Sequence, residues 1–122
     1  FAATCGDDGT DKERSKLHKK ALRAPMVIVG IASYQTHPKV PEIEQSMSAA
    51  VGMGYLLLAL ESAGFGVMWR TGAMAYNPMI ARGLGLDDNE VITGFLYTGS
   101  VNENKPGVPR PEQKDFVRRW PD

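Results

Sequence analysis

The stretch from residue 42 to residue 72 limits the fold of this 122-residue chain more than any other stretch. Residues 49–60 carry no charge, while glutamates follow Pro41, where negative charge suits the first turn of a helix. A helix that is apolar on all sides is either buried or spans a membrane, but a span needs about 20 apolar residues and this run is shorter. We therefore expect a long core helix from Glu42, buried on every side, that ends at residues 62–64.

The same helix contains several small residues, among them Gly52 and Gly54. A glycine inside a helix lowers the stability of that helix by roughly 1 kcal/mol relative to alanine. Small residues also let another backbone approach closely, so we expect tight packing at this helix. The packing partner is either another element of the same domain or a second subunit.

Helical and extended patterns alternate along the rest of the chain, and the tail from Asn102 is rich in proline and should be extended. The last helix fits residues 74–84, or it begins later, with Asn77 as its cap and Pro78 in the first position. The order of elements favours an α/β sandwich with a mixed or mainly parallel sheet around the long helix. The other expected elements are a helix at residues 12–22 and strands at residues 26–33, 65–70 and 90–99.

Fourteen Lys and Arg residues balance fourteen Asp and Glu residues, so the net charge is zero. This balance argues against a global field that recruits nucleic acid or an anionic membrane. The helix at residues 12–22 is locally basic, which we interpret as a solvated face, with nucleic-acid binding as the alternative. The single cysteine, Cys5, cannot form an internal disulfide, which favours a reducing, cytoplasmic setting.

The sequence contains neither the G-x-S-x-G turn of hydrolases nor a phosphate loop that ends in Gly-Lys-Ser/Thr. His18 and His37 lack a second ligand at metal spacing, so we expect no zinc site. The aspartates of residues 1–11 lack the alternation and the closing glutamate of a calcium loop, so we interpret this stretch as a solvated loop. The residues therefore point to no metal ion and to no catalytic side chain.

A more specific signal is GFGVMWRTG at residues 64–72. This segment resembles a motif of the nitroreductase family of flavoenzymes, and in particular of the small bacterial NAD(P)H nitroreductases. The resemblance runs from about residue 20 to residue 100. Three further pieces are similar to the same subgroup, namely RAP at residues 23–25, KVP at residues 39–41 with the EQ and MS pairs that follow it, and GFLYTG at residues 94–99.

The resemblance implies an α+β fold and a homodimer with the long helix at the interface. It implies FMN bound between the subunits, reduced by NADH or NADPH at the flavin N5 atom, and then reoxidised by nitro compounds, quinones or related small-molecule acceptors. The family piece that contacts FMN matches Trp69, Arg70, Thr71 and Gly72, and Arg70 would offset negative charge on reduced flavin or on a phosphate. A region tied to the nicotinamide cofactor matches at Ala59 and Gly64.

One departure from the family concerns the N-terminal side. The family begins with a helix whose Arg-Arg-Ser type motif grips the FMN phosphate, and neither this motif nor the flavin-contacting segment after it occurs in these residues. Residues 1–122 thus resemble a single nitroreductase-like domain without its N-terminal part. We expect the parent protein to be an FMN reductase, with this chain alone a weak flavin binder. The alternatives are a non-catalytic dimerisation or binding domain that keeps the fold, and a flavoenzyme of this fold with different chemistry.

Overall fold

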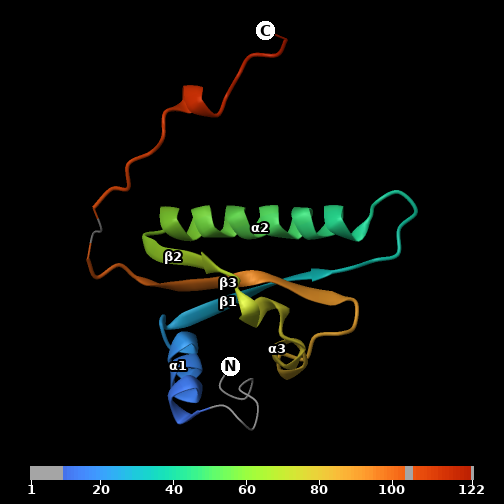
Figure 1. Cartoon of the computed structure of the whole chain (residues 1–122), viewed down its shortest axis with the longest axis vertical. Helices are drawn as coiled ribbons and strands as arrows, with labels where there is room; N and C mark the ends of the chain where they lie inside the picture. Colours follow the sequence, from blue (N-terminus) through green and yellow to red (C-terminus); the bar gives the residue numbers. More distant parts are fainter. Residues whose placement is uncertain (1–9, 104–105, 122) are drawn as a thin grey trace.

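The computed structural model, which describes residues 10–103 and 106–121, is built on a three-stranded sheet with helices on both sides (Figure 1). The strand order is β1–β3–β2, so the last strand of the chain lies at the centre and pairs with both others. The strands are β1 (Met26–Ser33), β2 (Phe65–Arg70) and β3 (Glu90–Ser100).

The α+β class is confirmed, but the prediction of a mixed sheet is wrong, because β3 runs antiparallel to both of its neighbours. The long helix does connect two strands of the same direction, as the order of elements suggested. However, β3 inserts between these two strands, so parallel neighbours do not pair anywhere in the described residues. Strand insertion joins segments that are far apart in the sequence, and local patterns carry no signal for it.

The long helix α2 (Glu42–Ser62) covers one face of the sheet. The opposite side carries α1 (Asp11–Ala21), the 3-10 helix η2 (Ala73–Tyr76) and α3 (Pro78–Gly83) (Figure 1). Met53 of α2 is buried on the first side, and a cluster of buried residues lies on the second side, where residues of η2 and α3 pack on β3. Its members are Ala75, Ile80, Ile92 and Phe95.

The start of α2 at Glu42 is as predicted, but the expectation that this helix is buried on every side is wrong for the single chain. Met53 is its only buried residue. Outward-facing residues follow one another at spacings of three or four and form what we call the apolar stripe: Ile43, Met47, Val51, Tyr55 and Leu58. Within one chain the sheet can cover only one side of a helix, and the rest of the apolar surface stays open.

By length and composition, α2 would also be long enough to cross a membrane, with a mean hydropathy of 1.2. In this structure the helix instead contacts all three strands. Met53 packs so closely on β1 that a Cβ added at Gly30 would lie 2.0 Å from the Met53 sulfur. These contacts support the prediction that α2 packs in a core rather than across a membrane. Its other side is also apolar and stays exposed in the single chain.

The shorter helices begin where local signals place them. Thr10 caps α1 through a capping box with Glu13, so this helix begins at Asp11, one residue before the predicted start. Asn77 caps α3 and Pro78 takes its first position, which confirms the later of the two predicted starts.

The two ends of the chain differ in how far the predictions for them can be checked. Most of the predicted N-terminal loop, including Cys5 and two of its aspartates, lies outside the described residues. The predicted extended tail is seen in residues 106–121, which run away from the sheet in Figure 1 and contain only the short 3-10 helix η3 (Gln113–Asp115).

Candidate cofactor site

Trp69 lies near the end of the edge strand β2, where it pairs with the fully buried Leu96 of β3. Its indole ring lies directly over Gly94, the second neighbour along β3. A Cβ added at Gly94 would lie 2.0 Å from the indole Nε1 atom, so only glycine leaves room for the ring. The half-buried Trp69 therefore forms a fixed wall at this end of the strand.

Arg70 is the last residue of β2 and is exposed. It pairs with Phe95, and residues directly opposite each other in an antiparallel pair point to the same face of a sheet. Because Phe95 belongs to the core on the η2–α3 side, Arg70 projects toward that side as well. Its Nε atom donates a hydrogen bond of 3.1 Å to the sulfur of Met68, and the described residues supply no carboxylate partner for its guanidinium.

Thr71 and Gly72 continue from β2 into η2, and both are exposed. Gly72 has a φ of 71°, which favours glycine, and nothing lies within 4 Å of the place where a Cβ would be. The Gly72 carbonyl accepts a hydrogen bond from the Ala75 amide, whereas no described hydrogen bond engages the amides of Thr71 and Gly72. Two free donors beside open space suit the acceptor atoms along one edge of a planar ring such as a flavin.

The two residues matched to the nicotinamide region lie elsewhere. Ala59 is on the last turn of α2, where its carbonyl accepts from the Ala63 amide, and Gly64 follows the helix with a φ of 89°. The whole of β2 separates Gly64 from Gly72, a distance of about 20 Å at the rise of an extended strand. The structure thus brings residues 69–72 together and leaves Ala59 and Gly64 at the other end of β2.

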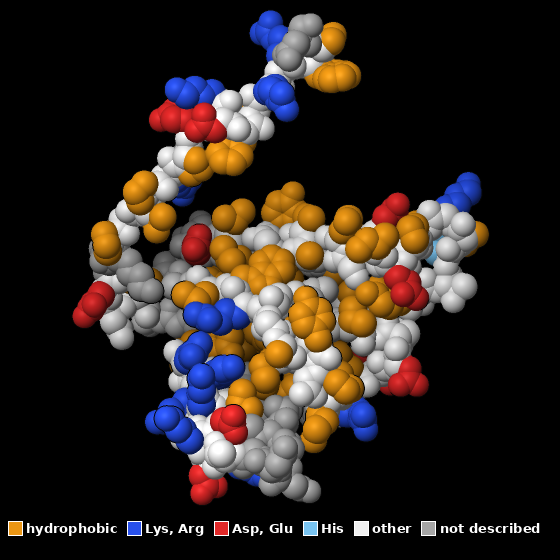
Figure 2. All heavy atoms as spheres, viewed as in Figure 1, with side chains coloured by type: hydrophobic (Ala, Val, Ile, Leu, Met, Phe, Trp, Pro, Cys, Tyr) orange, Lys and Arg blue, Asp and Glu red, His pale blue; other side chains and the backbone are white. Residues whose placement is uncertain are grey.

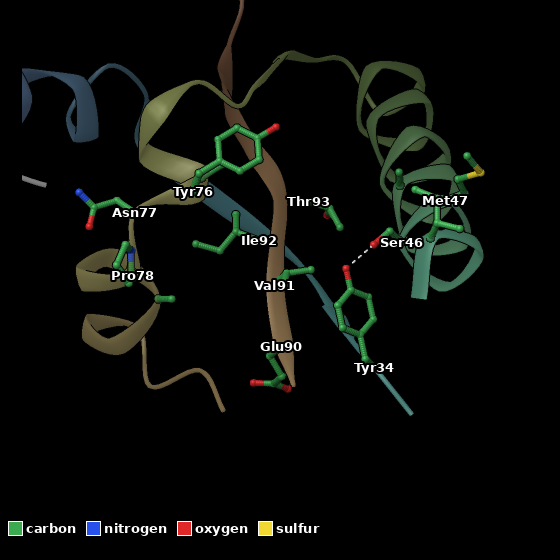
Figure 3. Close-up of a pocket in the computed structure, with 14 residues that line it drawn as sticks. Tyr34, Ser46, Met47, Tyr76, Asn77, Pro78, Glu90, Val91, Ile92 and Thr93 are labelled. Carbon is green, nitrogen blue, oxygen red and sulfur yellow. Dashed lines mark hydrogen bonds between the residues drawn. The ribbon is translucent and has the colours of Figure 1, made fainter. Parts of the chain in front are cut away.

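A cavity of about 650 Å³ opens beyond Gly72, between α2, η2 and the first half of β3. β2 ends opposite Phe95, so residues 90–94 of β3 have no strand beside them on this side. Side chains from four separate stretches of the chain surround the cavity (Figure 3). They include Tyr34, which directly follows β1, Ser46 and Met47 from α2, Tyr76 from η2 and Thr93 from β3.

Polar contacts hold Tyr34 at the wall of this cavity. The Asn89 side-chain amide donates to the Tyr34 carbonyl at 2.8 Å, and the Tyr34 hydroxyl forms a 2.6 Å hydrogen bond with the Ser46 hydroxyl (Figure 3). Gln45 bonds the backbone of the loop after β1 through both ends of its side-chain amide. Thr93 also lines the cavity. Its buried hydroxyl has no hydrogen-bond partner among the described residues.

The sequence did not reveal this cavity, because its walls come from segments that are up to 60 residues apart. In the sequence, the EQ and MS pairs after Pro41 matched the family, but no role in a binding site was assigned to them. Among the described residues, no group of three or more His, Cys, Asp or Glu side chains could hold a metal ion. The site offers the half-buried Trp69 ring, the cation of Arg70 and the unengaged amides of Thr71 and Gly72.

Comparison with known proteins shows the family and the fold of the chain. The model of the Nitroreductase family matches residues 6–100. A protein of Escherichia coli K12 named "Putative NAD(P)H nitroreductase YdjA" is 35% identical over 117 residues, which are 95% of this chain and 63% of that protein. The chain therefore spans somewhat less than two thirds of the length of this curated relative.

Two solved structures share the fold. The nitroreductase-like family protein from Bacillus cereus superposes with a TM-score of 0.75 at 24% identity, covering 93% of this chain and 62% of that one. A mutant of the FMN and NADPH-dependent nitroreductase NfnB, from a Sphigopyxis strain, gives a TM-score of 0.63 at 19% identity, covering 98% of this chain and 54% of that one. With the family model matched over most of the described residues, the chain belongs to the nitroreductase family.

Proposed function

We propose that this chain forms the cofactor-binding part of an FMN-dependent oxidoreductase that takes electrons from NADH or NADPH. Family membership and the name of the Escherichia coli relative support the reductase class. A fold neighbour that is described as FMN and NADPH-dependent supports the two cofactors. The electron acceptors we propose are nitro compounds, quinones or related small molecules.

The observation that carries the proposal is the segment of residues 69–72 at the end of β2. The amides of Thr71 and Gly72 would donate to acceptor atoms at the flavin edge, and Gly72 leaves space for the ring to approach. Arg70 would offset negative charge on the cofactor, and Trp69 would keep water from one side. FMN, when bound, supplies the hydride chemistry, so no acid–base pair of the protein is required.

We further propose a homodimer that buries the apolar stripe of α2. The stripe contains no charged side chain, and its five residues are each 57–70% exposed in the single chain. A surface of this kind on one helix is large for a soluble monomer and is typical of an interface. A protein partner also accounts for the hydropathy of α2 without a membrane. The cytoplasmic setting stays a prediction.

The visible absorption spectrum tests the cofactor assignment. Because this chain alone is expected to bind flavin weakly, the protein would be titrated with FMN at equilibrium, without a desalting step, and then reduced with NADPH without oxygen. A band of bound flavin that differs from that of free FMN, saturates with added protein and bleaches on reduction is the expected result. The variant Gly72→Val should lose the band because its side chain fills the approach and strains the backbone, whereas Gly107→Val, which is in open space in the tail, should keep it.

The competing function is a non-catalytic dimerisation domain that keeps the fold without flavin. It predicts a colourless protein that still dimerises through α2. Bleaching by NADPH without turnover of nitro compounds or quinones would instead indicate a flavoenzyme of the same fold with different chemistry, because acceptor choice lies in variable loops.

A further inference from the structure

The first helix carries a positive charge that the rest of the chain compensates. Residues 11–23 contain six Lys and Arg residues against two carboxylates, a net charge of +4 in a chain whose total is zero. Lys12, Lys16 and Lys19 follow helical spacing and are exposed, so they share one face of α1, and the exposed Arg23 follows the helix. We call these four residues the basic stripe.

Folding does not explain the basic stripe. α1 contains no buried residue, so its charged face does not shield a core. Lys19 lies in the last turn, where a cation suits the helix dipole, but Lys12 lies in the first turn, where a cation opposes it. The arrangement concentrates charge on a surface rather than optimising the helix.

The position of α1 relates the basic stripe to the candidate cofactor site. α1 and α3 lie on the side of the sheet opposite α2 (Figure 1), and Arg70 projects toward this same side. Figure 2 shows Lys and Arg side chains gathered over α1 and continuing upward toward the sheet. α1 and Arg70 therefore lie on the same side of the sheet.

The strand register gives the distance between Arg70 and Met26, the first residue of β1, which follows α1 after four residues. α1 leads into Met26, and the row of Arg70 crosses β1 at Val29, three residues further along. This separation is about 10 Å along the strands and about 10 Å across them, because two strand spacings lie between β2 and β1. The basic stripe from Lys12 to Lys19 extends about another 10 Å along the helix axis. An extended dinucleotide has similar dimensions.

We propose that the basic stripe binds the phosphate groups of the nicotinamide dinucleotide that delivers electrons to the site at residues 69–72. This inference rests on the proposed function and adds to it the residues that recognise the reductant. Lysine and arginine are the usual partners of phosphate groups. A stripe with several cations favours the dinucleotide with the additional 2′-phosphate, so NADPH should be preferred over NADH.

The test compares two variants that remove the same charge. The first is Lys12→Gln, Lys16→Gln and Lys19→Gln together, since glutamine keeps the helix propensity of lysine. The matched control is Lys39→Gln, Arg82→Gln and Lys114→Gln, three exposed cations on other elements. Binding of 2′,5′-ADP and of 5′-ADP would be measured by calorimetry, and the KM and kcat for NADPH and NADH by steady-state kinetics.

We expect the α1 variant to bind 2′,5′-ADP about tenfold more weakly, because three exposed charge contacts each contribute only part of a factor of ten. The KM for NADPH should rise by a similar factor and that for NADH by less, with kcat and flavin content unchanged. Equal losses in the two variants, or no loss in either, would overturn the proposal. A single-stranded oligonucleotide that binds more tightly than 2′,5′-ADP, with the same loss in the α1 variant, would assign the stripe to nucleic acid instead and also overturn it.

The adenosine phosphates separate this proposal from the proposed function, because their binding requires neither flavin nor turnover. A colourless protein that binds 2′,5′-ADP through the basic stripe would contradict the proposed reductase function and support phosphate binding by the stripe. A coloured protein that NADPH bleaches equally well in both variants would support the reductase function and contradict phosphate binding by the stripe.

Discussion

β3 and α2 are the two longest regular elements next to the candidate site, and they differ in how their apolar surface is covered. Five of the eleven residues of β3 are buried, including Phe95 and Leu96. α2 has 21 residues and a continuous uncharged run, yet Met53 is its only buried residue. The apolar surface of β3 is thus covered by its own chain, whereas that of α2 is covered on one side only.

The chain therefore covers β3 by itself, whereas the exposed side of α2 requires a partner to cover it. β3 has strands on both edges and α2 and η2 on its two faces, so its position follows from contacts within the chain. The apolar stripe of α2 has no such contacts among the described residues. Burial of apolar side chains contributes about 25 cal/mol per Å², so an uncovered stripe of this length favours association.

The largest effect is expected when the apolar stripe receives charges. Val51→Glu together with Tyr55→Glu should weaken dimerisation by about 4 kcal/mol, roughly a thousandfold in the dissociation constant, because each carboxylate would be buried without a partner. Sedimentation equilibrium measures this constant. Met79→Glu with Leu84→Glu places the same charges on exposed apolar positions of the opposite side and should leave the dimer intact. Similar weakening in both pairs would show that α2 is not the interface.

The next effect concerns the packing around β3, which is covered by its own chain. Gly94→Ala should lower the free energy of unfolding by about 3 kcal/mol, because the rigid indole of Trp69 occupies the place of the new methyl group. Gly30→Ala should also be destabilising, since the new methyl group would lie 2.0 Å from the flexible end of Met53 and 2.5 Å from the hydroxyl of the stiffer Thr93. Gly83→Ala should cost nothing, since its surroundings are open. Urea unfolding gives all three values. An unchanged midpoint for Gly94→Ala would mean that Trp69 is not held against β3.

A smaller effect is expected where the two regions meet at the cavity. Tyr34→Phe and Ser46→Ala should each lower stability by about 1 kcal/mol, because they share one hydrogen bond of 2.6 Å. The double variant should cost less than the sum of the single ones, since the second change has no bond left to remove. Fully additive losses in urea unfolding would indicate that the two hydroxyl groups act independently.

The smallest effect concerns α1, which lies apart from both regions. Thr10→Ala should destabilise this helix alone by about 0.5 kcal/mol, at the low end for an exposed cap. Hydrogen bonds from the backbone amide and then the hydroxyl of Thr10 lower the pKa of Glu13 below its ordinary value. The capping contribution is therefore full above the unfolded pKa of Glu13 and is lost as the pH falls through the lower folded value.

Amide exchange of α1 at several pH values measures this local stability. Protection in the unmodified protein should fall as the pH is lowered through the folded pKa of Glu13, which lies below the ordinary value, and Thr10→Ala should reduce that fall. A pH response that is the same with and without Thr10 would contradict the capping role.

Local signals in the sequence predicted the helix starts well, because Pro41 and the Asn77–Pro78 pair act on their immediate neighbours. They did not predict the position of β3 between β1 and β2, which depends on pairing between distant segments. They also overestimated the burial of α2 in the single chain. Apolar composition indicates that a surface becomes buried, but it does not indicate whether the same chain or a second chain buries it.

The candidate site divides in the same way. Residues 69–72 were found because they form one contiguous motif, and the structure places them at the end of an edge strand with open space beside Gly72. The cavity wall with Tyr34, Ser46 and Thr93 was not found, because folding brings these three residues together from separate segments. Whether Ala59 and Gly64 contact the reductant stays a prediction, and they lie at the far end of β2.

Sedimentation velocity, recorded at both the protein band and the visible flavin band after FMN has been added, tests whether FMN binds between two subunits that associate through α2. We expect flavin absorbance to sediment with a dimer, and we expect the Val51→Glu, Tyr55→Glu variant to lose both the dimer and the bound flavin. Flavin that sediments with a monomer, or a dimer that carries no flavin, would contradict the proposal that FMN binds between two subunits.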